Sequence, residues 1–219
     1  MDTSALTPAQ QRRASPERVK AFADAVFAII ITILVLEIGV PPNLGDSSLR
    51  GALDDLGPEL GAWVISFLIT GMYWVWHRDM FNLVRYVDPT VVWLNLLFLL
   101  PAALIPFAAS VLGEYPGESI GLHVYGVVLS ATALLRWILY RYVTLRPALL
   151  WAPLTPKARR LGGVLALAPL AIYLVAMLVA TPAPTLSLLM YLAVPALYLL
   201  LVLVLRHHPT TKGEAEDFS

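Results

Sequence analysis

The segment from Ala25 to Leu36 is the feature that most restricts how this chain can fold, because it carries no charge and Thr32 is its only polar residue. Such a segment is stable as a helix inside a bilayer, where a helix satisfies its own backbone hydrogen bonds. Further apolar segments follow along the 219-residue chain, which is 58% hydrophobic and 14% charged. These proportions exclude an ordinary soluble domain and predict an all-α, polytopic membrane protein.

Proline, glycine and charged residues divide the apolar sequence into six predicted membrane-spanning helices. We expect them at residues 18–38, 60–77, 89–112, 119–140, 161–180 and 185–205, with an acidic loop at 40–58. Pro101 and Pro106 each remove a backbone donor and should kink the third helix. The chain thus divides into a polar tail of residues 1–16, a six-helix domain of residues 17–205 and a second tail of residues 206–219.

The basic residues predict the orientation of the chain in the membrane. They gather before the first helix, in the second and fourth connections and after the last helix, and only Arg50 falls in another loop. Because basic residues are retained in the cytoplasm, both termini should be cytoplasmic. We expect Arg136 and Arg141 to extend toward the lipid headgroups, and Trp74 and Trp76 to form an interfacial aromatic belt.

The first helix should present two chemically different directions. At about 100° per residue, Ala25, Ile29, Thr32 and Leu36 fall on one face, while Asp24 projects roughly 140° away from that stripe. A carboxylate at membrane depth should face protein or water rather than lipid. From the residues alone, the stripe favours ordinary helix packing over a pore, because such stripes are common in packed helices.

A second candidate group consists of Asp24, His77 and Asn95, which the predicted topology places toward the cytoplasmic side of the first three helices. These side chains could meet between the helices. Taken singly, His77 also suits an interfacial position in water, and Asn95 suits a simple interhelical hydrogen bond. Lys20 lies four residues before Asp24 and competes with Arg18 as the partner of its carboxylate.

Three stretches give the chain a family resemblance. Arg18, Phe22 and Asp24 match an Arg-x-x-x-Phe-Ser-Asp pattern with Ala23 in place of the serine, and the stretches YWVWH at 73–77 and LNLLFLLPAALIPF at 94–107 follow. Together they resemble the bacterial relatives of the endolysosomal potassium channel called transmembrane protein 175. The resemblance implies a homotetramer in the cell inner membrane, in which the first helix of each subunit lines a central, potassium-conducting pore.

The resemblance also implies roles for individual residues. Ile29 and Leu36 would form a hydrophobic constriction, with Thr32 as a hydroxyl layer and Ile33 beside them. A polar network would hold the first helix against the second and third; its members would be Arg18, Phe22, Asp24, His77 and Asn95. The expected partners are potassium ions, the lipid bilayer and other copies of the chain, with no cofactor and no nucleic acid.

Other functional classes find less support in the residues. The chain has no cysteine, its four histidines are scattered, and it contains no glycine-rich phosphate loop and no nucleophile elbow, so we expect no enzyme activity and no metal site. The alternative is a proton- or solute-coupled secondary transporter with Asp24 and His77 as its relay. Such transporters carry inverted repeats, and residues 18–112 and 119–205 show no convincing similarity. A purely structural membrane protein is a third possibility.

Overall fold

The computed structural model describes residues 15–39, 51, 56–115 and 118–207, with side chains as far as residue 200. Its elements are α2 (Glu17–Leu34), the 3₁₀ turn η2 (Val35–Glu37), α4 (Gly57–Asn82), α5 (Pro89–Ala102), α6 (Ile105–Glu114), α7 (Ser119–Thr144), the 3₁₀ turn η3 (Pro147–Leu149), α8 (Pro156–Val179) and α9 (Pro184–His207). The all-helical fold is therefore confirmed within these residues. The two predicted tails and most of the predicted acidic loop lie outside them.

The predicted third helix is broken in two, as its prolines indicate. Pro101 lies inside α5 and Pro106 stands in the first turn of α6, so the break at residues 103–104 falls between them. Two other helices are longer than hydropathy predicts: α4 continues to Asn82 and α7 continues to Thr144. Their last turns carry charged residues that an apolar pattern assigns to connections.

Five helical segments are long and apolar enough to cross a membrane among the described residues. They are Glu17–Glu37, Gly57–Asn82, Pro89–Glu114, Ser119–Thr144 and Pro156–Val179, and a shorter apolar stretch of α9 covers Pro184–Leu200. Each of the five spans at least 18 residues, which matches the thickness of the hydrocarbon core. The protein is thus a multi-pass membrane protein.

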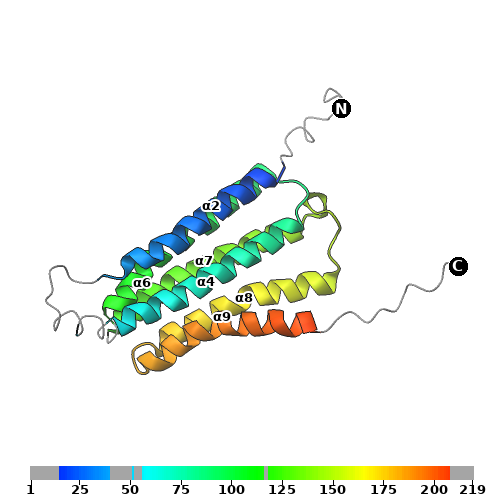
Figure 1. The fold of residues 1–219 in the computed structure, drawn as a ribbon. Coiled ribbons are helices and arrows are strands. Elements are labelled where there is room, and N and C mark those ends of the chain that lie inside the picture. Colours follow the sequence, from blue (N-terminus) through cyan, green and yellow to red (C-terminus); the bar gives the residue numbers. More distant parts are fainter. Residues whose placement is uncertain (1–14, 40–50, 52–55, 116–117, 208–219) are drawn as a thin grey trace.

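The helices form one bundle in which α4 and α7 lie between α2 on one side and α8 with α9 on the other (Figure 1). α2 begins and α9 ends at the same end of the bundle. The connections 83–88 and 145–155 also meet at this end: Val84 pairs with Leu150 in an isolated bridge, and the backbone N–H of Arg85 donates to the carbonyl of Leu149 at 2.7 Å. We call this the basic end of the bundle.

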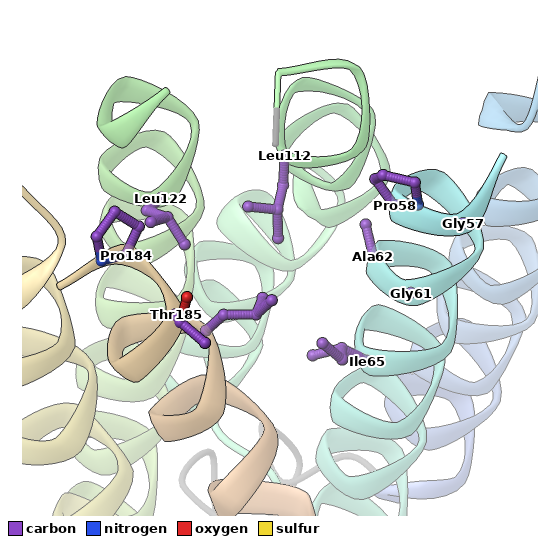
Figure 2. A pocket seen from close by; sticks show the side chains of 10 residues that line it. Gly57, Pro58, Gly61, Ala62, Ile65, Leu112, Leu122, Pro184 and Thr185 are labelled. Carbon is purple, nitrogen blue, oxygen red and sulfur yellow. The ribbon is translucent and has the colours of Figure 1, made fainter. Parts of the chain in front are cut away.

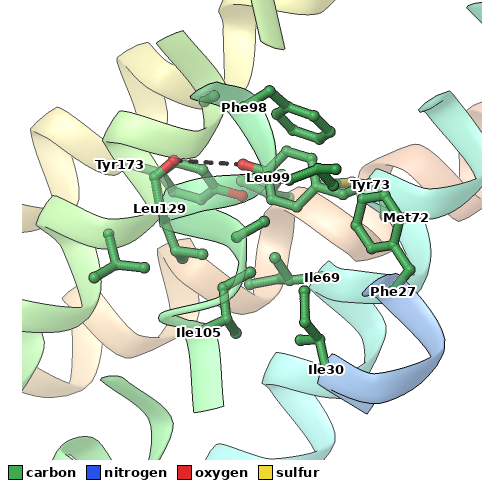
Figure 3. Packing of buried hydrophobic residues seen from close by; sticks show 14 of the residues in the cluster. Phe27, Ile30, Ile69, Met72, Tyr73, Phe98, Leu99, Ile105, Leu129 and Tyr173 are labelled. Atoms are coloured by element: carbon green, nitrogen blue, oxygen red, sulfur yellow. Dashed lines mark hydrogen bonds between the residues drawn. The ribbon is translucent and has the colours of Figure 1, made fainter. Parts of the chain in front are cut away.

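Aromatic side chains fill the core beneath α2. Phe27 and Ile30 point from α2 toward Tyr73 of α4 and Phe98 of α5 (Figure 3). The ring of Phe27 lies 6.0 Å from that of Phe98, and Tyr73 meets Phe98 edge-on at 6.2 Å. Offset and edge-to-face contacts of this kind add to the dispersion energy of the packed core. One face of α2 is therefore fixed firmly to the rest of the subunit.

The prediction for Arg136 is wrong. Its side chain is only 3% exposed, and its guanidinium donates to the backbone carbonyl of Ala166 in α8 and lies over the indole of Trp76. A carbonyl and an aromatic face inside the bundle replace the headgroups that this cation was expected to reach. Trp76 is accordingly a partner of this cation and not simply a member of an interfacial belt.

Candidate functional site

The site is built on α2, whose two faces have opposite surroundings. Phe27, Ile30 and Leu34 are each at most 3% exposed and pack into the core. On the other face Ile29 is 57% exposed and Leu36 is 77% exposed, although both are apolar. The 3.6-residue period separates Ile29 from the buried set within α2, and Leu36 lies in the 3₁₀ turn η2 that follows directly.

All four residues predicted to line a pore lie on the exposed side of the subunit. Ile33 and Thr32 are exposed between Ile29 and Leu36, and Ala25 continues the same face toward the N-terminus. At about 1.5 Å per residue, the face from Ile29 to Leu36 extends roughly 10 Å along the helix axis. The subunit therefore leaves this stripe free for lipid, water or another subunit.

The hydroxyl of Thr32 is bonded within its own helix. Its Oγ1 lies 2.9 Å from the carbonyl oxygen of Ile29 and 3.0 Å from that of Ala28, so it donates its single proton to these backbone acceptors. A threonine hydroxyl has one proton and two lone pairs. The lone pairs of Oγ1 thus stay available on the exposed face.

The carboxylate of Asp24 has a partner that sequence reasoning did not identify. The indole Nε1 of Trp74 donates to Asp24 Oδ1 at 2.8 Å, which joins α2 to α4. Lys20 instead donates from Nζ to Asn82 Oδ1 at 2.7 Å, and Arg18 is exposed. Within the described residues no ion pair joins Asp24 to either cation, so the expected ionic partner is replaced by a neutral donor.

His77 and Asn95 form a buried pair between α4 and α5. His77 Nε2 lies 2.7 Å from Asn95 Oδ1, and the two residues are 2% and 1% exposed. The imidazole stacks on Phe81 with ring centroids 4.4 Å apart, and Phe27 of α2 approaches the same ring at 5.9 Å. This burial is inconsistent with an interfacial histidine in water.

Three of the five residues predicted for the polar network take part in two separate hydrogen-bonded pairs. His77 meets Asn95, Asp24 meets Trp74, and no hydrogen bond between Asp24 and His77 occurs among the described residues. Phe22 is half exposed on α2 and takes no part in either contact. The signal for Trp74 lay in the stretch YWVWH, where it stands three residues before His77, one helical turn away.

A separate pocket lies at the opposite end of the bundle. It has a volume of about 240 Å³ and lies between the first turns of α4, α7 and α9 and the last turn of α6 (Figure 2). Pro58, Ala62, Leu112 and Leu122 line it, and Thr185 is its only hydroxyl-bearing residue. No residue singled out from the sequence faces this pocket.

Comparison with known proteins places the candidate site within a matched segment. Residues 18–106 match the family described as the endosomal/lysosomal potassium channel TMEM175. This segment contains α2, α4 and α5, and with them every candidate residue discussed above. It covers less than half of the chain.

Two curated bacterial relatives are similar over a longer stretch. A potassium channel from Streptomyces collinus is 41% identical over 131 residues, which cover 58% of this chain and 64% of that protein. A potassium channel from a Chryseobacterium species is 36% identical over 118 residues, which cover 53% of this chain and 59% of that protein. The chain thus matches less than two thirds of the length of either relative.

A solved structure matches nearly the whole fold. The crystal structure of a lysosomal potassium-selective channel TMEM175 homolog from Chamaesiphon minutus superposes with a TM-score of 0.75 and 27% sequence identity. The superposition covers 84% of this chain and 96% of that one. The chain is therefore similar to the TMEM175 family over residues 18–106, and its overall fold resembles that of one solved TMEM175 homolog.

Proposed function

We propose that the protein is a potassium-selective channel, a homotetramer in which α2 of each subunit lines one central pore. The observation that carries the proposal is the stripe along α2 and η2 on which Ile29, Thr32 and Leu36 are exposed in the subunit. An apolar face of this kind suits lipid as well as a shared axis. The names of the relatives and the matching fold favour the shared axis.

The apolar side chains of the stripe would form the constriction. Rings of Ile29 and Leu36 cannot replace the hydration shell of an ion, so they would conduct only when the ring is wide enough to remain wet. Ile33 lies partly exposed beside them and would narrow the same path. Such a constriction sets conductance through its radius.

The hydroxyl layer would supply the preference for potassium. Because Thr32 donates its proton to Ala28 and Ile29 of its own helix, its oxygen lone pairs face outward as acceptors for a cation. Potassium sheds part of its hydration shell at lower cost than sodium. A ring of four such oxygens beside an apolar constriction would therefore favour potassium, less sharply than a filter of backbone carbonyls does.

The polar contacts would hold the pore helix in place. The bond from Trp74 to Asp24 fixes α2 to α4, and the buried pair of His77 and Asn95 fixes α4 to α5 beneath Phe27. Six spans, cytoplasmic termini and a location in the inner membrane complete the proposal. Its orientation is supported by the basic connections, which share one end of the bundle.

Flux into sealed liposomes tests this function directly. We expect purified protein to carry potassium down a potassium gradient without a proton gradient or any other driving force, and native mass spectrometry to give the mass of a tetramer. A control preparation reconstituted with Ile29→Trp should conduct less, because a bulkier ring closes the constriction. Uptake that depends on a proton gradient and disappears in Asp24→Asn would instead favour the transporter and overturn the channel.

A further inference from the structure

A long segment of the chain, which contains α7, α8 and α9, has cations but no acids. Residues 119–213 contain eight lysine and arginine residues and no aspartate or glutamate. The ion pair between Arg78 and Asp79 is the only one among the described residues, and it belongs to the first half. Within the part of the chain that the structure describes, no acid therefore forms an ion pair with these cations.

Four of these cations surround one groove at the basic end of the bundle. The groove has a volume of about 790 Å³ and lies between the last turn of α7 and the first turns of α8. Its charged residues come from both helices, and its apolar residues belong to α8 alone. The lining comprises Arg141, Lys157, Arg159, Arg160, Leu161 and Val164, together with Pro156.

Along α8, the cationic residues of the groove come first and the apolar residues follow. A phospholipid presents its charged headgroup and its acyl chains in the same order. Lys157 and Arg160 lie in the first turns of α8, where a membrane-spanning helix leaves the headgroup layer. Leu161 and Val164 follow along the same helix and are 58% and 60% exposed. At about 1.5 Å per residue, Val164 lies roughly 10 Å deeper than Lys157, within the range of an acyl chain.

We propose that this groove binds an anionic phospholipid, with the phosphate between the four cations and an acyl chain against Leu161 and Val164. Basic pockets between membrane helices are suited to acidic headgroups. A free phosphate ion would satisfy the charges but leave the apolar floor uncovered. The site is independent of the proposed pore, because α8 lies on the far side of the bundle from α2 (Figure 1).

A bias of basic residues toward one side of the membrane does not account for the groove. Arg146 lies in the connection between α7 and α8 and contributes to that bias as much as the groove cations do. It is nevertheless outside the groove and lies over the ring of Tyr142. Arg85 lies at the same end and contacts the rings of Tyr86 and Trp151. These two residues provide controls with the same loss of charge.

Native mass spectrometry measures how tightly the full chain binds phospholipid. The protein is purified in detergent and titrated with phosphatidylglycerol or, separately, with phosphatidylcholine. Each cation beside an acidic headgroup contributes about a fivefold factor in affinity. The double variant Lys157→Gln/Arg160→Gln should therefore weaken phosphatidylglycerol binding by roughly twenty-fivefold. The double variant Arg85→Gln/Arg146→Gln should leave it within about twofold. Equal effects in the two double variants, or no effect in either, would overturn the proposal.

A second measurement needs no substitution. Lys157 and Lys20 can be acetylated with an amine-reactive reagent in nanodiscs of phosphatidylcholine, with and without phosphatidylglycerol. We expect phosphatidylglycerol to slow acetylation of Lys157 severalfold relative to Lys20, which lies at the same end of the bundle. If millimolar inorganic phosphate in phosphatidylcholine nanodiscs protects Lys157 as well, the groove is a free-phosphate site. That result, or equal protection of both lysines, refutes the lipid assignment.

Discussion

Two neighbouring isoleucines on α2 provide a matched test of the helix. Ile30 is 3% exposed and lies in the aromatic core, whereas Ile29 is 57% exposed on the proposed pore face. Substituting alanine for either residue removes the same atoms from the same helix. The two variants differ only in the surroundings from which those atoms are lost.

The expected magnitudes follow from that difference. Ile30→Ala leaves a cavity in a packed core, and such changes cost about 2–5 kcal/mol in soluble proteins. By the same analogy, the melting temperature should fall by roughly 4–20 °C for a chain of this size. Ile29→Ala should change stability much less, because Ile29 is already 57% exposed in the subunit. It should also widen the constriction, raise ion flux and admit sodium more readily.

The assay compares thermal melting of the oligomer with potassium and sodium flux in liposomes. Both variants and the unmodified protein are reconstituted at equal protein-to-lipid ratios. The account is refuted if Ile29→Ala loses as much stability as Ile30→Ala and gains no flux. Its side chain would then pack against a partner surface and would not border a pore.

Three further predictions concern the supports and the topology. Asp24→Asn should lower tetramer yield or melting temperature, because the charged acceptor of the Trp74 indole becomes neutral; size-exclusion chromatography and melting curves test this, and unaltered assembly contradicts it. Gly113→Ala should destabilise the bundle, since a Cβ there would lie 2.9 Å from the Cα of Glu59, whereas Gly61→Ala has open space; equal melting temperatures would contradict this contrast. A reporter fused after Ser219 should be cytoplasmic, and a periplasmic signal would overturn the six-span arrangement.

Much of the fold was predictable because hydropathy and proline act locally. The uncharged run from Ala25 to Leu36 is part of a helical segment, and the break between α5 and α6 falls between Pro101 and Pro106. The helical period also predicts that Asp24 projects away from the helix face that is exposed in the structure. These features depend on residues within a few turns of one another.

The partners of polar side chains were not predictable in the same way. Trp74 and Arg136 were assigned to the membrane interface from their positions along the chain, yet Trp74 bonds Asp24 and Arg136 reaches the carbonyl of Ala166. Their surroundings depend on which helices become neighbours, and hydropathy carries no such information. The proposed four-fold assembly likewise depends on surfaces of separate copies, and the expectation of a tetramer rests on the family resemblance.

The ratio of potassium to sodium flux through Thr32→Val, measured in liposomes beside Thr32→Ser, tests the central claim most directly. Valine keeps the volume and branching of threonine but removes the oxygen, whereas serine keeps the oxygen. If α2 lines the pore, Thr32→Val loses most of its potassium preference and Thr32→Ser keeps it, while both tetramers melt near the temperature of the unmodified protein. An unchanged flux ratio in Thr32→Val would contradict the assignment of α2 as the pore helix.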